Sequence, residues 1–149
     1  MDMIGSTLPG MGSGKTPDGI DPTTGQHFRV LIIDDSATIR KIVSQILKSE
    51  AYDIAGEAGD GENGVQLYKE LKPDVVTLDV NMPYKDGIAT LREILDYDKK
   101  ATVVMLSSES QKNTVVNAIT MGAKNYIVKP PVREKVLEKV RNALKLKSI

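Results

Sequence analysis

Two short runs of aliphatic and β-branched residues in this chain end in aspartate. Residues 30–33 are followed by Asp34 and Asp35, and residues 75–78 are followed by Asp79. Runs of this kind are typical of strands buried on both faces of a parallel sheet, so a charged residue is tolerated only where the strand leaves the sheet. Open α/β sheets bind their ligands at the carboxyl ends of the strands. We therefore expect these carboxylates to converge on one crevice.

Strand and helix patterns alternate from Phe28 onward. The segment after the first run begins with Ser36, a suitable N-cap, and places apolar residues on one helical face. Such alternation with right-handed crossovers predicts an α/β fold, a five-stranded parallel sheet with helices on both faces. The expected strands span residues 28–33, 52–58, 75–79, 102–107 and 125–129, and the expected helices begin near residues 36, 62, 87 and 111, with a last helix around residues 136–144.

The length of 149 residues supports one domain with its own core. Residues 1–27 differ from the rest, because they carry six of the twelve glycines and three of the seven prolines. This composition predicts a flexible N-terminal arm, followed by a folded domain over residues 28–149. Within the arm, residues 10–16 resemble a phosphate-binding loop, but the outer glycine is misplaced and no strand precedes it, so we do not expect nucleotide binding there.

Composition excludes several classes of function. The 20 basic and 20 acidic residues balance, and no basic block marks a nucleic-acid interface. The absence of cysteine excludes disulfides and thiolate chemistry, and the single histidine, His27, precedes the first strand. No segment approaches the roughly 20 apolar residues of a membrane span or has the layout of a signal peptide. We expect a cytoplasmic protein with no nucleic-acid or membrane partner.

The expected strand ends carry further polar groups besides the aspartates. Ser107 ends the fourth strand and Lys129 ends the fifth. Clustered carboxylates repel one another, and oxygen ligands of this kind favour Mg²⁺. A lysine and a hydroxyl beside a metal could hold the oxygens of a transferring phosphoryl group. The nucleophile would then be a carboxylate.

These residues resemble the response-regulator receiver domains, and within that family the single-domain chemotaxis regulators. The similarity runs from about Phe28 to Leu146, and its motifs are very specific together. It implies a flavodoxin-like (βα)5 fold with strand order 2-1-3-4-5. The motifs that carry the resemblance are residues 34–36 (Asp-Asp-Ser), 79–87 (Asp-Val-Asn-Met-Pro-Tyr-Lys-Asp-Gly), 106–107 (Leu-Ser) and 126–130 (Tyr-Ile-Val-Lys-Pro).

The resemblance assigns the metal site and the phosphorylated residue. It implies that Asp79 accepts the phosphoryl group and that Asp34 and Asp35 hold Mg²⁺ together with Asp79 and the backbone carbonyl of Asn81.

The resemblance also assigns the groups around the phosphate. Lys129 and Ser107 would contact the phosphate oxygens, and the bond between Lys129 and Pro130 would be cis. The hydroxyl of Ser107 would move toward the phosphate and allow the ring of Tyr126 to turn inward.

The implied function is a chemotaxis switch. A histidine kinase would donate the phosphoryl group, the flagellar motor switch would bind the phosphorylated form, and a dedicated phosphatase would be a further partner. No enzymatic activity beyond the chain's own phosphorylation and dephosphorylation is expected. Asn81 and Glu109 resemble the residue pair of chemotaxis regulators, which favours this function over that of a phosphorelay intermediate.

A phosphatase of the haloacid dehalogenase type is an alternative with similar chemistry. That class also forms an aspartyl phosphate with Mg²⁺, but it places its nucleophile on the first strand and a general acid two residues later. Here Asp79 lies on the third expected strand, and the amide of Asn81 cannot donate a proton to a leaving group. A nucleotide-binding flavodoxin relative is also disfavoured, because no phosphate-cradling loop follows the first strand.

Overall fold

The computed structural model describes residues 16–147; residues 1–15 of the predicted arm, and with them most of the glycine-rich run, lie outside the described residues. Five strands and five α-helices alternate in the described part of the chain. The elements are β1 (Arg29–Ile33), α1 (Ala37–Lys48), β2 (Asp53–Ala58), α2 (Gly61–Leu71), β3 (Val75–Asp79), α3 (Gly87–Tyr97), β4 (Val103–Ser107), the 3₁₀-helix η2 (Glu109–Gln111), α4 (Lys112–Met121), β5 (Asn125–Val128) and α5 (Arg133–Lys147).

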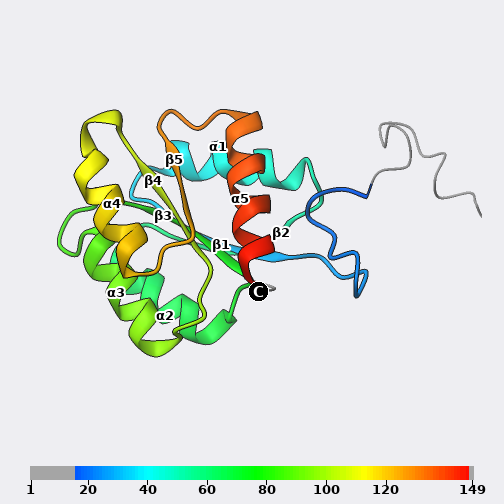
Figure 1. Ribbon diagram of the computed structural model, residues 1–149, viewed down its shortest axis with the longest axis horizontal. Helices are drawn as coiled ribbons and strands as arrows, with labels where there is room; N and C mark the ends of the chain where they lie inside the picture. The colour runs from blue at the N-terminus through cyan, green and yellow to red at the C-terminus, as the bar shows by residue number, and fades with distance from the viewer. Residues whose placement is uncertain (1–15, 148–149) are drawn as a thin grey trace, which may run out of the picture.

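The strands form one parallel sheet in the order β2-β1-β3-β4-β5. The predicted fold and strand order are confirmed. Helices α1 and α5 cover one face of the sheet, and α2, α3 and α4 cover the other (Figure 1). This arrangement places the carboxyl ends of all five strands at one edge.

Alternating side chains on each strand divide the core into two layers. In β1, Leu31 and Ile33 pack toward α2, α3 and α4, whereas Val30 and Ile32 pack toward α1 and α5. All four side chains are buried, because a parallel sheet covered on both faces leaves no exposed position within a central strand. The continuous apolar runs in the sequence therefore reflect burial from both sides.

Polar side chains cap the helices that follow the strands. Ser36 accepts a hydrogen bond from the backbone N–H of Ile39 (3.2 Å), as predicted for the start of α1. Asp60 and Asp86 cap α2 and α3 in the same way. The expected fourth helix is present as α4, which begins one residue later than expected, at Lys112. The separate 3₁₀-helix η2 before it was not expected.

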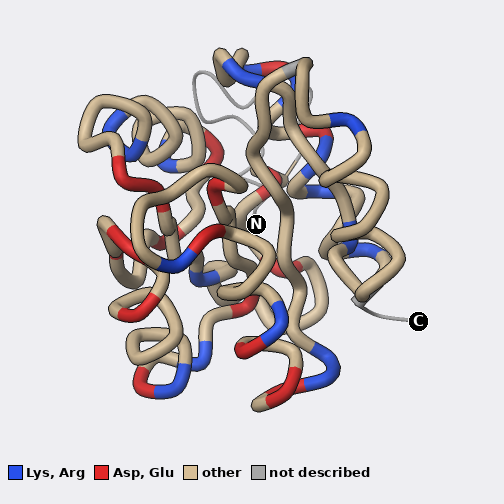
Figure 2. Tube along the Cα trace, turned by 90° about the vertical axis from the view of Figure 1, so that its left-hand side faces the viewer, with Lys and Arg blue, Asp and Glu red and all other residues tan. Residues whose placement is uncertain are grey.

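Charged residues of both signs are interspersed along the chain trace (Figure 2), in keeping with the equal numbers of basic and acidic residues. Among the described residues, no helix combines the length and apolar character needed to cross a bilayer.

Residues 16–28, here called the N-terminal hairpin, pack against the domain. Ile20 forms an antiparallel bridge with His27, so the segment folds back on itself. The backbone N–H of Gly19 donates to the carbonyl of Glu50 (2.6 Å), and the N–H of Phe28 donates to the carbonyl of Gly19 (2.8 Å). The expectation of a flexible arm did not include these contacts, because a segment with few apolar residues gave no sign of docking through backbone groups.

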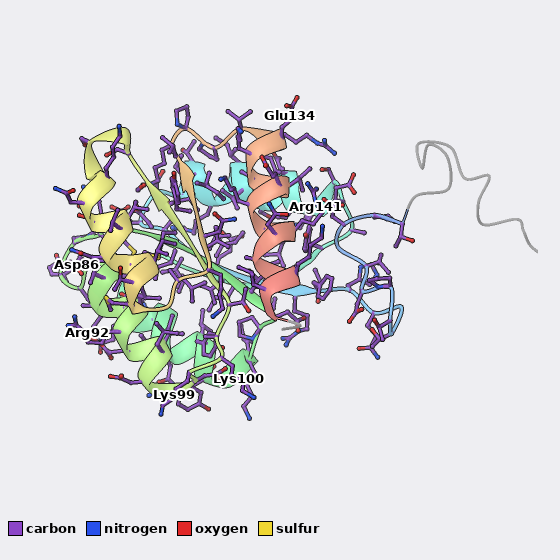
Figure 3. All side chains as sticks on the ribbon, viewed as in Figure 1. Asp86, Arg92, Lys99, Lys100, Glu134 and Arg141 are labelled. Atoms are coloured by element: carbon purple, nitrogen blue, oxygen red, sulfur yellow. The ribbon has the colours of Figure 1, made fainter. Side chains whose placement is uncertain are left out.

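One ion pair links the N-terminal hairpin to the last helix. A guanidinium nitrogen of Arg141 on α5 lies 2.9 Å from Asp18 Oδ2, and the Asp18 side chain is only 6% exposed. Figure 3 shows Arg141 on the side of α5 that faces the hairpin. The hairpin therefore connects the α1–β2 loop, through Glu50, with α5.

Gly19→Ala is expected to lower the free energy of unfolding by about 1 to 3 kcal/mol. A Cβ atom at Gly19 would lie 2.2 Å from the Tyr52 nitrogen and 2.4 Å from the Ala51 carbonyl carbon, and neither backbone atom can move without disturbing the start of β2. Urea denaturation measures the loss. A chain beginning at residue 28 should lose a similar amount of stability, and an unchanged denaturation midpoint in both variants would show that the hairpin contributes nothing.

Candidate functional site

The carboxyl ends of β1 and β3 bring three carboxylates together. Asp34, Asp35 and Asp79 each offer an oxygen, and these oxygens lie within 4.8 Å of one another. Asp34 and Asp79 are almost fully buried, with 1% and 2% of their surface exposed, whereas Asp35 is exposed. We call these three residues the carboxylate cluster. Their convergence follows from the pairing of β1 directly with β3.

Lys129, which follows β5, supplies the positive charge of the site. Its ammonium nitrogen lies 3.0 Å from Asp79 Oδ1 and 3.2 Å from Asp34 Oδ2. Its backbone N–H donates to the carbonyl of Ser107 (2.7 Å), which anchors the residue to the end of β4. The bond between Lys129 and Pro130 is cis, as expected.

The two carboxylate oxygens of Asp79 have different surroundings. Oδ1 accepts hydrogen bonds from the Lys129 ammonium (3.0 Å) and from the backbone N–H of Asn81 (3.1 Å). Oδ2 is buried, and no hydrogen-bond donor contacts it within residues 16–147. A buried polar atom without a partner lowers the stability of the folded state. A cation or a covalent bond at Oδ2 would remove this cost.

The carboxyl group of Asp79 resists ionisation. Burial raises the pKa of Asp79 to about 6; the hydrogen bond from Lys129 opposes the rise, and the neighbouring Asp34 carboxylate adds to it. Burial alone would lower the pKa of Lys129, but the contacts with Asp79 and Asp34 outweigh that effect and raise it. The lysine is therefore held in its charged form, as a permanent partner of the two carboxylates.

The residues present fit a hard divalent cation. The three carboxylates have one ammonium group beside them, which pairs with Asp34 and Asp79, so negative charge remains to be neutralised. Asp79 Oδ2 has no protein donor in the described residues. Carboxylate oxygens are the ligands that Mg²⁺ prefers, and it keeps several water molecules when only one or two carboxylates bind it. The exposure of Asp35 leaves one side of the cluster open to solvent.

Comparison with known proteins decides the family. Residues 30–141 match the response regulator receiver domain. The chain belongs to this family. Chemotaxis protein CheY of Treponema pallidum (strain Nichols) is 47% identical over 133 residues, which cover 88% of this chain and 92% of that protein. Chemotaxis protein CheY of Thermotoga maritima is 42% identical and covers 78% of this chain and 98% of its own length.

A solved structure supports the same assignment. A chain in the crystal structure of the CheX-CheY-BeF3-Mg²⁺ complex from Borrelia burgdorferi is 44% identical to this receiver domain and has a TM-score of 0.81. The alignment covers 84% of this chain and 95% of that chain. The resemblance inferred from the motifs is therefore confirmed at the level of family and fold.

The structure brings most of the predicted site residues of this receiver domain together. Asp34, Asp35, Asp79 and Lys129 form one cluster. Ser107 is buried at the end of β4, next to β3 and β5, and joins the cluster through its backbone bond to Lys129. Their roles in metal binding and phosphorylation stay predictions, as does the metal contact of the Asn81 carbonyl.

Tyr126 lies outside the carboxylate cluster, on β5. The residue is 38% exposed, and the ammonium group of Lys139 lies 5.3 Å from the centroid of its ring. It borders a groove of about 460 Å³ between α4 and β5, here called the α4–β5 groove. Ser107 also lines this groove, and its backbone carbonyl accepts the hydrogen bond from Lys129. Ser107 therefore links the groove to the residue that contacts the carboxylate cluster.

Arg40 is a further residue near the site that was not predicted from the sequence. This residue lies at the start of α1, and its guanidinium donates to the backbone carbonyl of Asp34 (2.6 Å). The sequence gives only a weak indication of this contact. A cation near the N-terminus of a helix is disfavoured by the helix dipole, so such a residue is expected to have a specific partner. The sequence alone did not show which partner that would be.

Proposed function

We propose that this receiver domain is a chemotaxis switch in which Asp79 accepts a phosphoryl group from a histidine kinase. The main support for this proposal is that the two carboxylate oxygens of Asp79 have different hydrogen-bond partners. Oδ1 accepts from Lys129 and Asn81, whereas Oδ2 is buried and has no donor among the described residues. In the transfer, Asp79 Oδ2 forms a bond to phosphorus while the bond between phosphorus and the kinase histidine nitrogen breaks.

The neighbouring residues have distinct parts in this transfer. The ammonium group of Lys129 holds Asp79 Oδ1 and turns toward the phosphoryl oxygens as negative charge arrives, with the hydroxyl of Ser107 as a second donor. The carboxylates of Asp34, Asp35 and Asp79 and the backbone carbonyl of Asn81 would hold Mg²⁺. When bound, Mg²⁺ neutralises the negative charge of the transferring group. The chain thus acts only on its own phosphorylation state.

The haloacid dehalogenase alternative is disfavoured by position as well as by residue type. Asp79 ends β3 and lies beside β1, so the nucleophile does not occupy the first strand. Asn81, which contributes a backbone N–H to Asp79 Oδ1, has an amide side chain that cannot act as a general acid.

The α4–β5 groove is the proposed output surface, and the flagellar motor switch is its proposed partner. Large apolar side chains that are otherwise solvent-exposed gather there, and such patches commonly mark protein interfaces. Similarity to proteins named chemotaxis protein CheY supports this choice. The exposed apolar residues of the groove are Val116, Ile119, Tyr126 and Val128.

Beryllofluoride with Mg²⁺, a mimic of the phosphoryl group, is expected to tighten binding of a motor-switch peptide. Coupling between two sites of one domain is typically worth 5- to 150-fold in affinity, and we expect a gain of roughly 10-fold or more. Tyr126→Ala should reduce this gain, because the ring borders the groove beside Ser107. Fluorescence anisotropy with a labelled peptide measures both affinities. Equal affinities with and without the mimic in the wild-type protein would refute the motor-switch output and favour a phosphorelay role.

A further inference from the structure

The exposed member of the carboxylate cluster lacks a side-chain partner. The side chain of Asp35 makes no hydrogen bond or ion pair with any described residue, although its oxygen lies within 4.8 Å of those of Asp34 and Asp79. Its direction therefore depends on the backbone of the short turn between β1 and α1. A residue that holds this backbone controls where the carboxylate points.

Several hydrogen bonds hold the turn, and three of them involve Asp34. The N–H of Asp34 donates to the carbonyl of Ala58 (3.0 Å), and the N–H of Ser36 donates to Asp34 Oδ1 (2.9 Å). Arg40 Nη1 donates to the backbone carbonyl of Asp34 (2.6 Å). That carbonyl belongs to the peptide unit that joins Asp34 to Asp35. Among these bonds, the one from Arg40 is the contact made directly to this peptide unit.

A second contact keeps the guanidinium of Arg40 in place. Arg40 Nε lies 3.2 Å from Glu57 Oε1 on β2, and the Arg40 side chain is 21% exposed. The planar guanidinium presents several donors in a fixed geometry, so one side chain can bind the carbonyl and the carboxylate together. Arg40 thereby ties the β1–α1 turn to the neighbouring strand.

The charge of Arg40 acts against metal binding. It stands near the N-terminus of α1, where the helix dipole disfavours a cation, and the first turn of this helix has no acidic residue to offset it. A positive charge near the carboxylate cluster also repels Mg²⁺. If Arg40 acted only through its charge, its removal would tighten Mg²⁺ binding. If it acts by holding the turn, its removal weakens Mg²⁺ binding.

We propose that Arg40 is a positioning residue for the metal ligand Asp35, acting through its hydrogen bond to the Asp34 carbonyl and held in place by Glu57. This role rests on the proposed function, because it assumes that the carboxylate cluster binds Mg²⁺. Arg40 does not touch the metal or the phosphoryl group. Its contribution is to reduce the number of orientations that Asp35 samples before the metal binds.

The test is a titration of the metal-free protein with Mg²⁺ by calorimetry, without any phosphodonor. Arg40→Met should weaken Mg²⁺ binding by about 10- to 100-fold, the usual range for residues that orient metal ligands. Arg92→Met is the matched control, since it removes the same charge from an exposed side chain on α3, at the outer edge of the molecule (Figure 3). This control should bind Mg²⁺ as the wild-type protein does.

Two further variants keep the test decisive. Arg40→Lys keeps the charge but loses the planar set of guanidinium donors. It should bind Mg²⁺ more tightly than Arg40→Met and more weakly than the wild-type protein. This variant replaces Arg40→Met in the test if Arg40→Met does not fold. Glu57→Gln should weaken binding by only a few-fold, because the amide oxygen still accepts from Arg40.

The outcomes separate this role from the metal site itself. Unchanged or tighter Mg²⁺ binding in Arg40→Met, or wild-type affinity in Arg40→Lys when Arg40→Met is unfolded, overturns the positioning role and leaves the metal site intact. Failure of the wild-type protein to bind Mg²⁺ overturns the metal site and the positioning role with it.

Discussion

Asp79→Asn is expected to abolish covalent labelling of this receiver domain by acetyl phosphate in the presence of Mg²⁺. The amide keeps the shape of the side chain and can still accept from Lys129 and from the N–H of Asn81, but it has no nucleophilic carboxylate oxygen. Intact-mass spectrometry measures the labelled fraction. The wild-type protein should gain a single phosphoryl group, and none when the metal is chelated.

The matched control for this experiment is Asp96→Asn, which changes an exposed aspartate on α3 and should label like the wild-type protein. Persistent stoichiometric labelling of Asp79→Asn at another residue would show that the nucleophile is misassigned. Loss of labelling in both variants would point to a general effect of removing negative charge rather than to the chemistry of Asp79.

The same Asp79→Asn variant should be more stable than the wild-type protein when metal is absent. Burial raises the pKa of Asp79 from 3.8 to about 6, so the folded state favours the protonated carboxyl group. The wild-type protein therefore loses stability as pH rises from about 4 through 6, while asparagine cannot ionise. We expect a gain of about 1 to 3 kcal/mol at pH 7.5 in chelator and little gain at pH 4, measured by urea denaturation. An equal gain at both pH values would contradict this explanation.

Gly87→Ala is expected to destabilise the protein by about 3 kcal/mol or more and to reduce labelling of the molecules that remain folded. A Cβ atom at Gly87 would lie 2.2 Å from the backbone oxygen of Asp79 and 2.7 Å from Val80 Cα. These atoms belong to the end of β3 that carries Asp79, the proposed nucleophile, so relief of the clash must move this aspartate. Thermal unfolding and intact-mass labelling measure the two effects.

Gly59→Ala is the control for this substitution. The atom nearest to a Cβ at Gly59 is Arg40 Nη1, at 3.4 Å, which is ordinary van der Waals contact, so the change should cost much less stability than Gly87→Ala. Similar losses in the two variants would show that the close approach of Gly87 to β3 is not what limits the substitution.

Most of the fold could be predicted from the sequence, because its strands are buried on both faces. A strand such as Val75–Asp79 must avoid charged side chains until it leaves the sheet, and this requirement is visible in the residue order alone. The caps are local as well: Ser36 binds an N–H three residues later. The convergence of Asp34, Asp35 and Asp79 also follows from sequence, because parallel strands end at one edge and the aspartates stand at those ends.

Contacts between residues far apart in the chain could not be predicted in this way. The docking of Gly19 on the α1–β2 loop depends on a backbone surface that exists only after the domain has folded. The bridge from Arg40 to Glu57 requires α1 and β2 to be neighbours, and the sequence of α1 contains no sign of it. The sequence by itself determined which polar residues stand at the strand ends, because burial and strand ends impose a local pattern. Only the tertiary structure decided which oxygen of Asp79 lacks a partner within residues 16–147 and which side chain binds the Asp34 carbonyl, because these depend on distances between separate elements.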